Sequence, residues 1–186
     1  AIAVLSGVKE FVPIPIQVVG KAYYKILPAF SEKKTEFWAK DAFVRRYVLW
    51  KEEVNLVDDK SRLKWVRNVS AANVWNPFQD LMYGDGLYEE LQKTDTTKVI
   101  ELVDSNPIRD DDNNWIVEYD LTTYRTGQKL SINGNPPTVR HRAVIKLGKL
   151  LDEYEPSEDD LRDNPLRLRV DGYSPSEMTK SQEVGK

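Results

Sequence analysis

The chain has 186 residues, of which 40% are hydrophobic and 31% are charged, so it is long enough and apolar enough to bury a core. Its formal net charge of −3 argues against a nucleic-acid-binding protein that works by neutralising phosphates. The absence of cysteine and the single histidine exclude disulfides, thiolate chemistry, zinc–thiolate centres and multi-histidine metal sites.

The N-terminal residues predict a lead-in segment followed by two short strands. Ala1 to Leu5 form an apolar run, and we interpret residues 1–10 as the trailing edge of a membrane segment or as a linker. Residues 11–19 alternate at a period of two and contain two prolines, which indicates an edge strand or an extended arm. Residues 21–27 follow as a second short strand.

A long helix is predicted from an N-cap at Thr35 to about Asn55. One of its apolar stripes recurs at helical spacing and consists of Ala39, Phe43, Tyr47, Trp50 and Val54. Further apolar residues lie on its other sides, so the helix must be covered on several sides. Either the rest of the domain covers all of them, or one stripe belongs to a subunit interface.

Two shorter helices are expected next. Asp58 caps one that runs through about Ser70. Asn76 and Pro77 are typical of the N-cap and first position of a third helix, and Gly86 closes the helical half of the chain.

The period then changes to two, which predicts four strands. They are expected over residues 98–104, 115–125, 138–147 and 166–173. Helices followed by a run of strands predict an α+β fold, with an antiparallel sheet of about four strands packed on three N-terminal helices. Glu118 and Asp120 on its outer face are expected opposite basic rows of other strands. Residues 11–174 form the expected domain, and residues 175–186 are predicted to be a disordered tail.

The residues alone identify no catalytic, cofactor or metal site. His141 lies among apolar neighbours on a predicted strand, which favours a core histidine over a catalytic one. Asp110–Asp112 lack the spacing of a calcium loop and are interpreted as a solvated turn. Residues 152–163 carry seven acids and one arginine; they are either a partner contact or an ordinary solvated loop.

Three local patterns occur in an order that resembles a known family. Phe43–Val48 followed by Glu52–Glu53 is similar to a first-helix pattern of Tyr-Val and a nearby acid, and Val66–Ser70, Val74–Trp75 and Phe78 match positions in the next helices. Asn164–Pro165–Leu166 stands where the family has Asn-Pro-x-Gly, with Arg167 in place of the glycine. From about Val12 to Tyr173, the chain resembles the periplasmic domain of the VirB8 family, an inner-membrane assembly component of bacterial type IV secretion systems.

The resemblance implies a cone of helices on a curved antiparallel sheet, like nuclear transport factor two. It implies an assembly factor with no catalytic activity and no cofactor, facing the periplasm and anchored in the inner membrane by a helix that precedes these residues. Such a protein self-associates as a dimer or higher oligomer and contacts other secretion subunits; direct nucleic-acid binding is not expected. The expected contact residues are Arg46, Tyr47, Asn164, Pro165, Leu166 and Arg167. For each of them a scaffolding role is the alternative.

Cone folds of this kind also contain small-molecule enzymes, so a second hypothesis stays open. In an enzyme, His141, Tyr119 and Tyr124 would supply acid–base groups. A catalytic pocket needs several convergent ionisable groups, whereas the predicted inward faces are mostly apolar. A periplasmic domain unrelated to secretion is a third hypothesis, and the cargo, DNA or protein, is left open.

Overall fold

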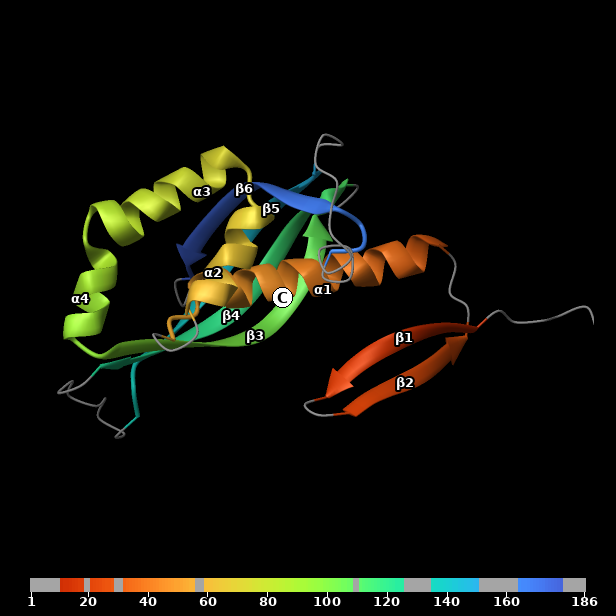
Figure 1. The fold of residues 1–186 in the computed structure, drawn as a ribbon, viewed down its shortest axis with the longest axis horizontal. Helices are drawn as coiled ribbons and strands as arrows, with labels where there is room; N and C mark the ends of the chain where they lie inside the picture. Colours follow the sequence, from red (N-terminus) through yellow and green to blue (C-terminus); the bar gives the residue numbers. More distant parts are fainter. Residues whose placement is uncertain are drawn as a thin grey trace, which may run out of the picture. The chain divides into compact units, whose positions relative to one another are not determined.

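The computed structural model describes residues 11–18, 21–28, 32–55, 59–108, 111–125, 135–150 and 164–178. Two compact units make up the chain, Ala1–Trp38 and Ala39–Lys186, and each is described by itself (Figure 1). Three predicted segments lie outside the described residues. They are the acidic stretch 152–163, predicted as a partner contact or a solvated loop, residues 1–10, predicted as a membrane edge or a linker, and the part of the tail beyond residue 178.

The first unit contains a β-hairpin. Strand β1 (Phe11–Val18) pairs antiparallel with β2 (Lys21–Pro28), and the two form a two-stranded sheet of their own. These bounds agree with the two strands predicted from the alternating pattern. The first helix begins in the same unit and continues into the second.

The helical part has four α-helices rather than the three predicted. They are α1 (Glu32–Glu52), α2 (Asp59–Asn68), α3 (Ala72–Gln79) and α4 (Leu87–Lys93), with a π-turn η1 (Asp80–Gly84) between the last two. The third helix begins five residues before Pro77, which lies inside it instead of at its first turn. Gly86, predicted to end the helical half, has a φ of 76° and connects η1 to α4.

The sheet is antiparallel, in the order β3-β4-β5-β6, which confirms the predicted α+β class. Its strands are β3 (Thr96–Ile108), β4 (Asp111–Arg125), β5 (Thr138–Lys149) and β6 (Leu168–Glu177). Strand β6 continues four residues beyond the predicted end and is followed by buried Met178. The register shifts at two bulges, where the extra residue is Val103 of β3 opposite β4 and Asp171 of β6 opposite β5.

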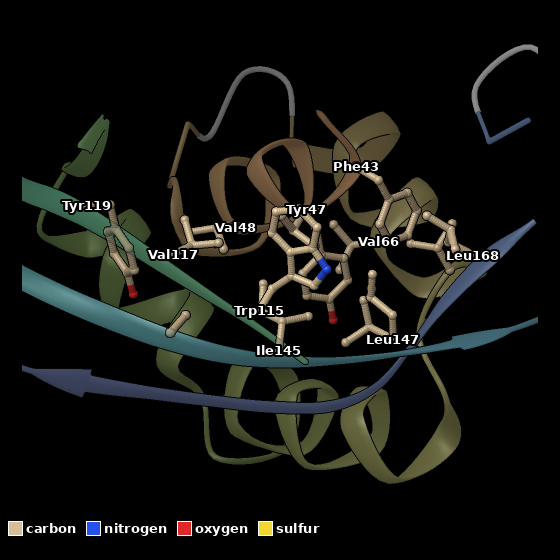
Figure 2. Close-up of a cluster of buried hydrophobic side chains, with 14 of the residues drawn as sticks. Phe43, Tyr47, Val48, Val66, Trp115, Val117, Tyr119, Ile145, Leu147 and Leu168 are labelled. Carbon is tan, nitrogen blue, oxygen red and sulfur yellow. The ribbon is translucent and has the colours of Figure 1, made fainter. Parts of the chain in front are cut away.

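The core lies between the helices and the inner face of the sheet. Figure 2 shows Tyr47 and Val48 of α1 facing Trp115 of β4 and Ile145 of β5, all fully buried. On β5, Ala143, Ile145 and Leu147 alternate along the strand and are all buried, whereas Val139 and His141 of the same row are half-buried. Burying one large side chain of this kind contributes about 1.5–3 kcal/mol.

The outer face of the sheet carries the expected ladder of opposite charges. Arg140 on β5 pairs with Asp120 on β4 through two 2.8 Å hydrogen bonds, and Arg142 pairs with Glu118 at 2.8 Å. Each pair sits directly across the strands in the register, where opposite charges stabilise the sheet by about 0.2–1 kcal/mol.

Candidate docking site

A groove between α1 and the turn before β6 brings together residues that are about 120 positions apart in the chain. This docking groove has a volume of about 160 Å³ and is lined by Ala39, Ala42, Phe43, Arg46, Asn164, Pro165, Leu166 and Leu168. Four of the six contact residues predicted from the sequence therefore lie on one surface. The small side chains of Ala39 and Ala42 let a partner approach the helix backbone closely.

Arg46 is held in place at the groove by aromatic rings. Its guanidinium carbon lies 3.9 Å from the centre of the Trp50 ring and 4.5 Å from that of Trp65. The two indoles contact each other edge to face, with 5.0 Å between centroids. A guanidinium over aromatic faces gains cation–π energy and loses side-chain freedom before any partner arrives. Arg46 is thus an ordered cation at the rim of an apolar groove.

The turn that forms the other wall is fixed by Asn164. Its side-chain Nδ2 donates to the Leu168 carbonyl at 2.7 Å, and its Oδ1 accepts from the Leu168 N–H at 2.8 Å. Asn164 is only 6% exposed, whereas Pro165 is exposed and Leu166 is half-buried. Asn164 therefore shapes the turn, whereas the side chains of Pro165 and Leu166 are accessible at its surface.

Asn164→Ala is expected to lower the free energy of unfolding by about 2 kcal/mol, because it leaves a buried N–H and a buried carbonyl of Leu168 without partners. Pro165→Ala changes an exposed side chain in the same turn and serves as the matched control, with a change below about 0.5 kcal/mol. Urea unfolding of both variants tests this. Equal stability of the two would contradict the structural role of Asn164.

Arg167 occupies a backbone conformation that normally favours glycine. Its φ is +52°, in the left-handed region, its N–H donates to the Asn164 carbonyl at 3.0 Å, and its carbonyl accepts from Leu150 at 2.8 Å. A side chain in this region costs about 1–2 kcal/mol relative to right-handed backbone. The geometry explains why a glycine suits this position of the Asn-Pro-x-Gly pattern, and shows that this chain tolerates arginine there.

Arg167→Gly is expected to stabilise the fold by up to about 1 kcal/mol, since relief of the left-handed strain exceeds the entropy that glycine adds to the unfolded chain. Arg167→Val is expected to destabilise it by a similar amount or more, because a β-branched residue resists positive φ. Thermal unfolding compares the three proteins. The prediction fails if valine is tolerated as well as glycine.

Tyr47 lies in the core and not on the groove. It is fully buried, its hydroxyl hydrogen-bonds to Ser70 Oγ at 2.8 Å, and its ring contacts Tyr173 with 5.6 Å between centroids. Burial raises its pKa far above the ordinary value of 10. Its position agrees with the scaffolding alternative, in which Tyr47 is a core residue.

A second, larger cavity of about 570 Å³ lies at the other end of α1. Its walls come from the end of α1, from α2, from the α3–η1–α4 segment and from β6. More than half of the lining residues are apolar. The polar and charged residues that line the cavity are Lys51, Glu52, Glu53, Asp59, Arg62, Asn73, Lys98 and Tyr173. We call this space the helical pocket.

Lys51 is the unusual residue of the helical pocket. It is 7% exposed, and its ammonium nitrogen lies 3.5 Å from the centre of the Phe78 ring and 5.3 Å from that of Tyr173. Burial lowers the pKa of Lys51 to about 8, although the nearby charge of Glu52 acts in the opposite direction. No carboxylate of the described residues forms an ion pair with it, because Glu52 instead accepts a 2.7 Å hydrogen bond from the Tyr173 hydroxyl.

The residues proposed for an enzyme do not converge. Tyr119 and His141 stack on the inner face of the sheet with 5.5 Å between ring centroids, but neither lines the helical pocket. Tyr124 is 48% exposed and belongs to the opposite row of β4. In the described part of the chain, no group of three or more acidic or histidine side chains is placed to hold a metal ion.

Sequence reasoning missed Lys51 and Tyr173 as site residues. Lys51 is a single basic residue in the last turn of α1, where lysine is common for reasons of helix polarity alone. Its burial arises from Phe78 and Tyr173, which lie far away in the chain, so no local pattern could indicate it. Among the described residues, no helix is both long and apolar enough to cross a bilayer.

The comparisons with known proteins agree on one family. The protein-family sequence model with the description VirB8 protein matches residues 1–177 of this chain. The solved structure of the VirB8 protein of Agrobacterium tumefaciens superposes with a TM-score of 0.66 at 20% identity, covering 82% of this chain and 98% of that one. The soluble domain of TrwG of the type IV secretion machinery of Bartonella grahamii gives 0.60 at 13% identity, covering 81% and 98%.

A third solved structure carries a small molecule. The TraE protein in complex with 4-(1H-pyrrol-1-yl)pyridine-2-carboxylic acid has a TM-score of 0.62 at 15% identity, and the match covers 81% of this chain and 99% of TraE. None of the curated protein sequences shows a significant match. At these identities the superpositions establish the shared fold.

Proposed function

Because this chain belongs to the VirB8 family of type IV secretion proteins, we propose that it is a non-catalytic assembly component of a type IV secretion channel. It acts by self-association and by contacts with other inner-membrane and core-complex subunits. The observation that carries the proposal is the docking groove, where Arg46, Asn164, Pro165 and Leu166 meet on one surface. The proposal includes an inner-membrane location, with this domain facing the periplasm.

The groove has the properties of a protein–protein contact. Its walls are mostly apolar, its cation is ordered in advance by two tryptophans, and its exposed proline has little freedom to lose. A second copy of the chain is the partner that we propose for it, since self-association is what the family resemblance implies. Pro165→Ala is expected to weaken that self-association while leaving stability unchanged.

Deleting the gene in its own bacterium tests the secretion role. Conjugative DNA transfer or effector export is measured after complementation with the membrane-anchored gene, with the same gene lacking its membrane segment, and with Pro165→Ala. Restoration by the anchored form alone supports an inner-membrane assembly role. Normal transfer in the deletion strain would overturn the proposal.

A second candidate function is the binding of a small carboxylic acid in the helical pocket. The observation that favours it is Lys51, a buried ammonium that forms no ion pair with a carboxylate of the described residues, although Glu52, Glu53 and Asp59 also line the pocket. The relative TraE is described in complex with pyridine carboxylic acids. Titration of the chain with 2-chloroisonicotinic acid, followed by NMR, is expected to shift signals around Lys51. Shifts confined to other regions would exclude this pocket.

A further inference from the structure

The β1–β2 hairpin has a composition unlike the rest of the chain. Between Phe11 and Phe30 there are two lysines, Lys21 and Lys25, and no acidic residue, whereas the whole chain is acidic. Apart from Gln17 and Gly20, the other residues of this stretch are aliphatic, aromatic or proline. A stretch that is mainly apolar and carries only positive charge, within an acidic protein, is expected to contact a partner that is apolar and anionic.

The pairing register places apolar residues on both faces of the hairpin. One face is formed by Val12, Ile14, Ile16, Val18, Lys21, Tyr23, Lys25 and Leu27. The other face is formed by Phe11, Pro13, Pro15, Gln17, Ala22, Tyr24, Ile26 and Pro28. Both lysines thus share the face that carries the β-branched row, and each face has one tyrosine of the adjacent pair Tyr23–Tyr24.

A two-stranded sheet of this kind is at best marginally stable in water without a third strand or a covering surface. Addition of a further strand to β1 is disfavoured by its own sequence. Prolines are accommodated where their nitrogen faces away from the ladder, so Pro13 and Pro15 remove two donors from the outward edge of β1. A surface that stabilises the hairpin must therefore contact its faces and not its strand edges.

We propose that the hairpin lies on the surface of an anionic phospholipid membrane, with the face of Ile14, Ile16 and Tyr23 toward the acyl chains. Tyrosine and lysine beside an aliphatic row are typical of the bilayer interface, where the ring sits among the headgroups and the ammonium meets lipid phosphates. The eight-residue strands fall short of a membrane-spanning strand, and their open edges exclude burial in the hydrocarbon. An interfacial position leaves those edges in contact with water and headgroups.

This inference goes beyond channel assembly and is tested on the whole 186-residue chain. The chain has no cysteine, so one cysteine introduced at Tyr23 or at Ser174 is labelled with the environment-sensitive dye NBD at a single site. Tyr23 belongs to the face proposed to contact lipid, whereas Ser174 is exposed on β6 and serves as the control position. Vesicles of phosphatidylcholine with 30% phosphatidylglycerol are expected to shift the emission of the Tyr23 label to the blue and to leave the Ser174 label unchanged.

Vesicle flotation then measures which residues carry the binding. Lys21→Gln/Lys25→Gln is expected to weaken partition into anionic vesicles about thirty-fold, and Ile14→Ser/Ile16→Ser to abolish it. The exposed pair Lys60→Gln/Lys64→Gln on α2 removes the same charge and is expected to have little effect. The proposal is overturned if no variant changes flotation, if the wild type stays unbound, or if the Tyr23 label shifts with protein concentration in the absence of lipid, which would identify a second copy as the cover.

Discussion

Ala42→Arg is expected to weaken self-association about a hundred-fold while the fold keeps its stability to within about 1 kcal/mol. Ala42 is an exposed residue of α1 that lines the docking groove beside Arg46. An arginine there covers the groove with a long side chain and adds a second cation to a surface that must be desolvated on docking. Arginine is nearly as good a helix former as alanine, so the helix itself loses only a few tenths of a kcal/mol.

Sedimentation velocity over a range of concentrations measures the effect. Gln92→Arg makes the same change of charge at an exposed position of α4, away from the groove, and is the control. If Gln92→Arg weakens association as much as Ala42→Arg does, net charge and not the groove governs the contact. If neither variant has an effect, the copies meet through another surface, and the groove loses its proposed role.

Much of the sheet could be predicted because period-two alternation is a local signal. The buried row of β5 and the charge ladder on its other face both follow from the pleat, which sends alternate side chains to opposite faces. The ion pairs Arg140–Asp120 and Arg142–Glu118 confirm the predicted pairing of acidic and basic rows. Here the local sequence pattern and the tertiary structure favour the same strand pairing, so few alternative pairings compete with it.

The helix boundaries between residues 70 and 95 were wrong because proline and glycine were interpreted only as start and stop signals. Pro77 lies inside α3, in a helix that passes directly into the π-turn η1. Gly86 adopts positive φ, which turns the chain into α4 rather than ending the helical part. A small core of Val54, Met82 and Leu91 supports this segment, and those contacts are not visible in a local window.

The docking groove shows the same division between local and distant information. The residue types in Asn164–Pro165 indicate a turn, yet only the fold places that turn against Ala42 and Arg46 of α1. The family resemblance pointed to both segments, and the structure shows that they line one groove. The structure also distinguishes Asn164, which holds the turn, from Pro165, which is exposed.

Burial of the charged Lys51 side chain lowers the stability of the fold. Burial lowers its pKa in the folded chain to about 8, against the usual 10.5 of a lysine, so the folded chain disfavours the charged form. Near pH 7 this penalty is at most about 3.5 kcal/mol, from roughly 1.4 kcal/mol per pKa unit. The Phe78 ring at 3.5 Å offsets part of it. A buried charge that destabilises its own fold is typical of a functional position.

Lys51→Met is expected to raise the free energy of unfolding at pH 7 by about 1–3 kcal/mol and to abolish binding of 2-chloroisonicotinic acid. In the wild type, the unfolded chain binds the extra proton between pH 8 and 10.5, so stability rises with pH over that window. Above about pH 10 the stability falls again, because burial raises the pKa of Tyr47, Tyr119 and Tyr173, so these tyrosines ionise only in the unfolded chain.

Urea unfolding at pH 7, 8, 9 and 10 tests this prediction. The free energy of unfolding should rise with pH in the wild type and in the exposed-lysine control Lys64→Met, but not in Lys51→Met. A rise of equal slope in all three proteins would show that Lys51 is an ordinary, solvated lysine, and the proposal of carboxylate binding at Lys51 would then lose its basis.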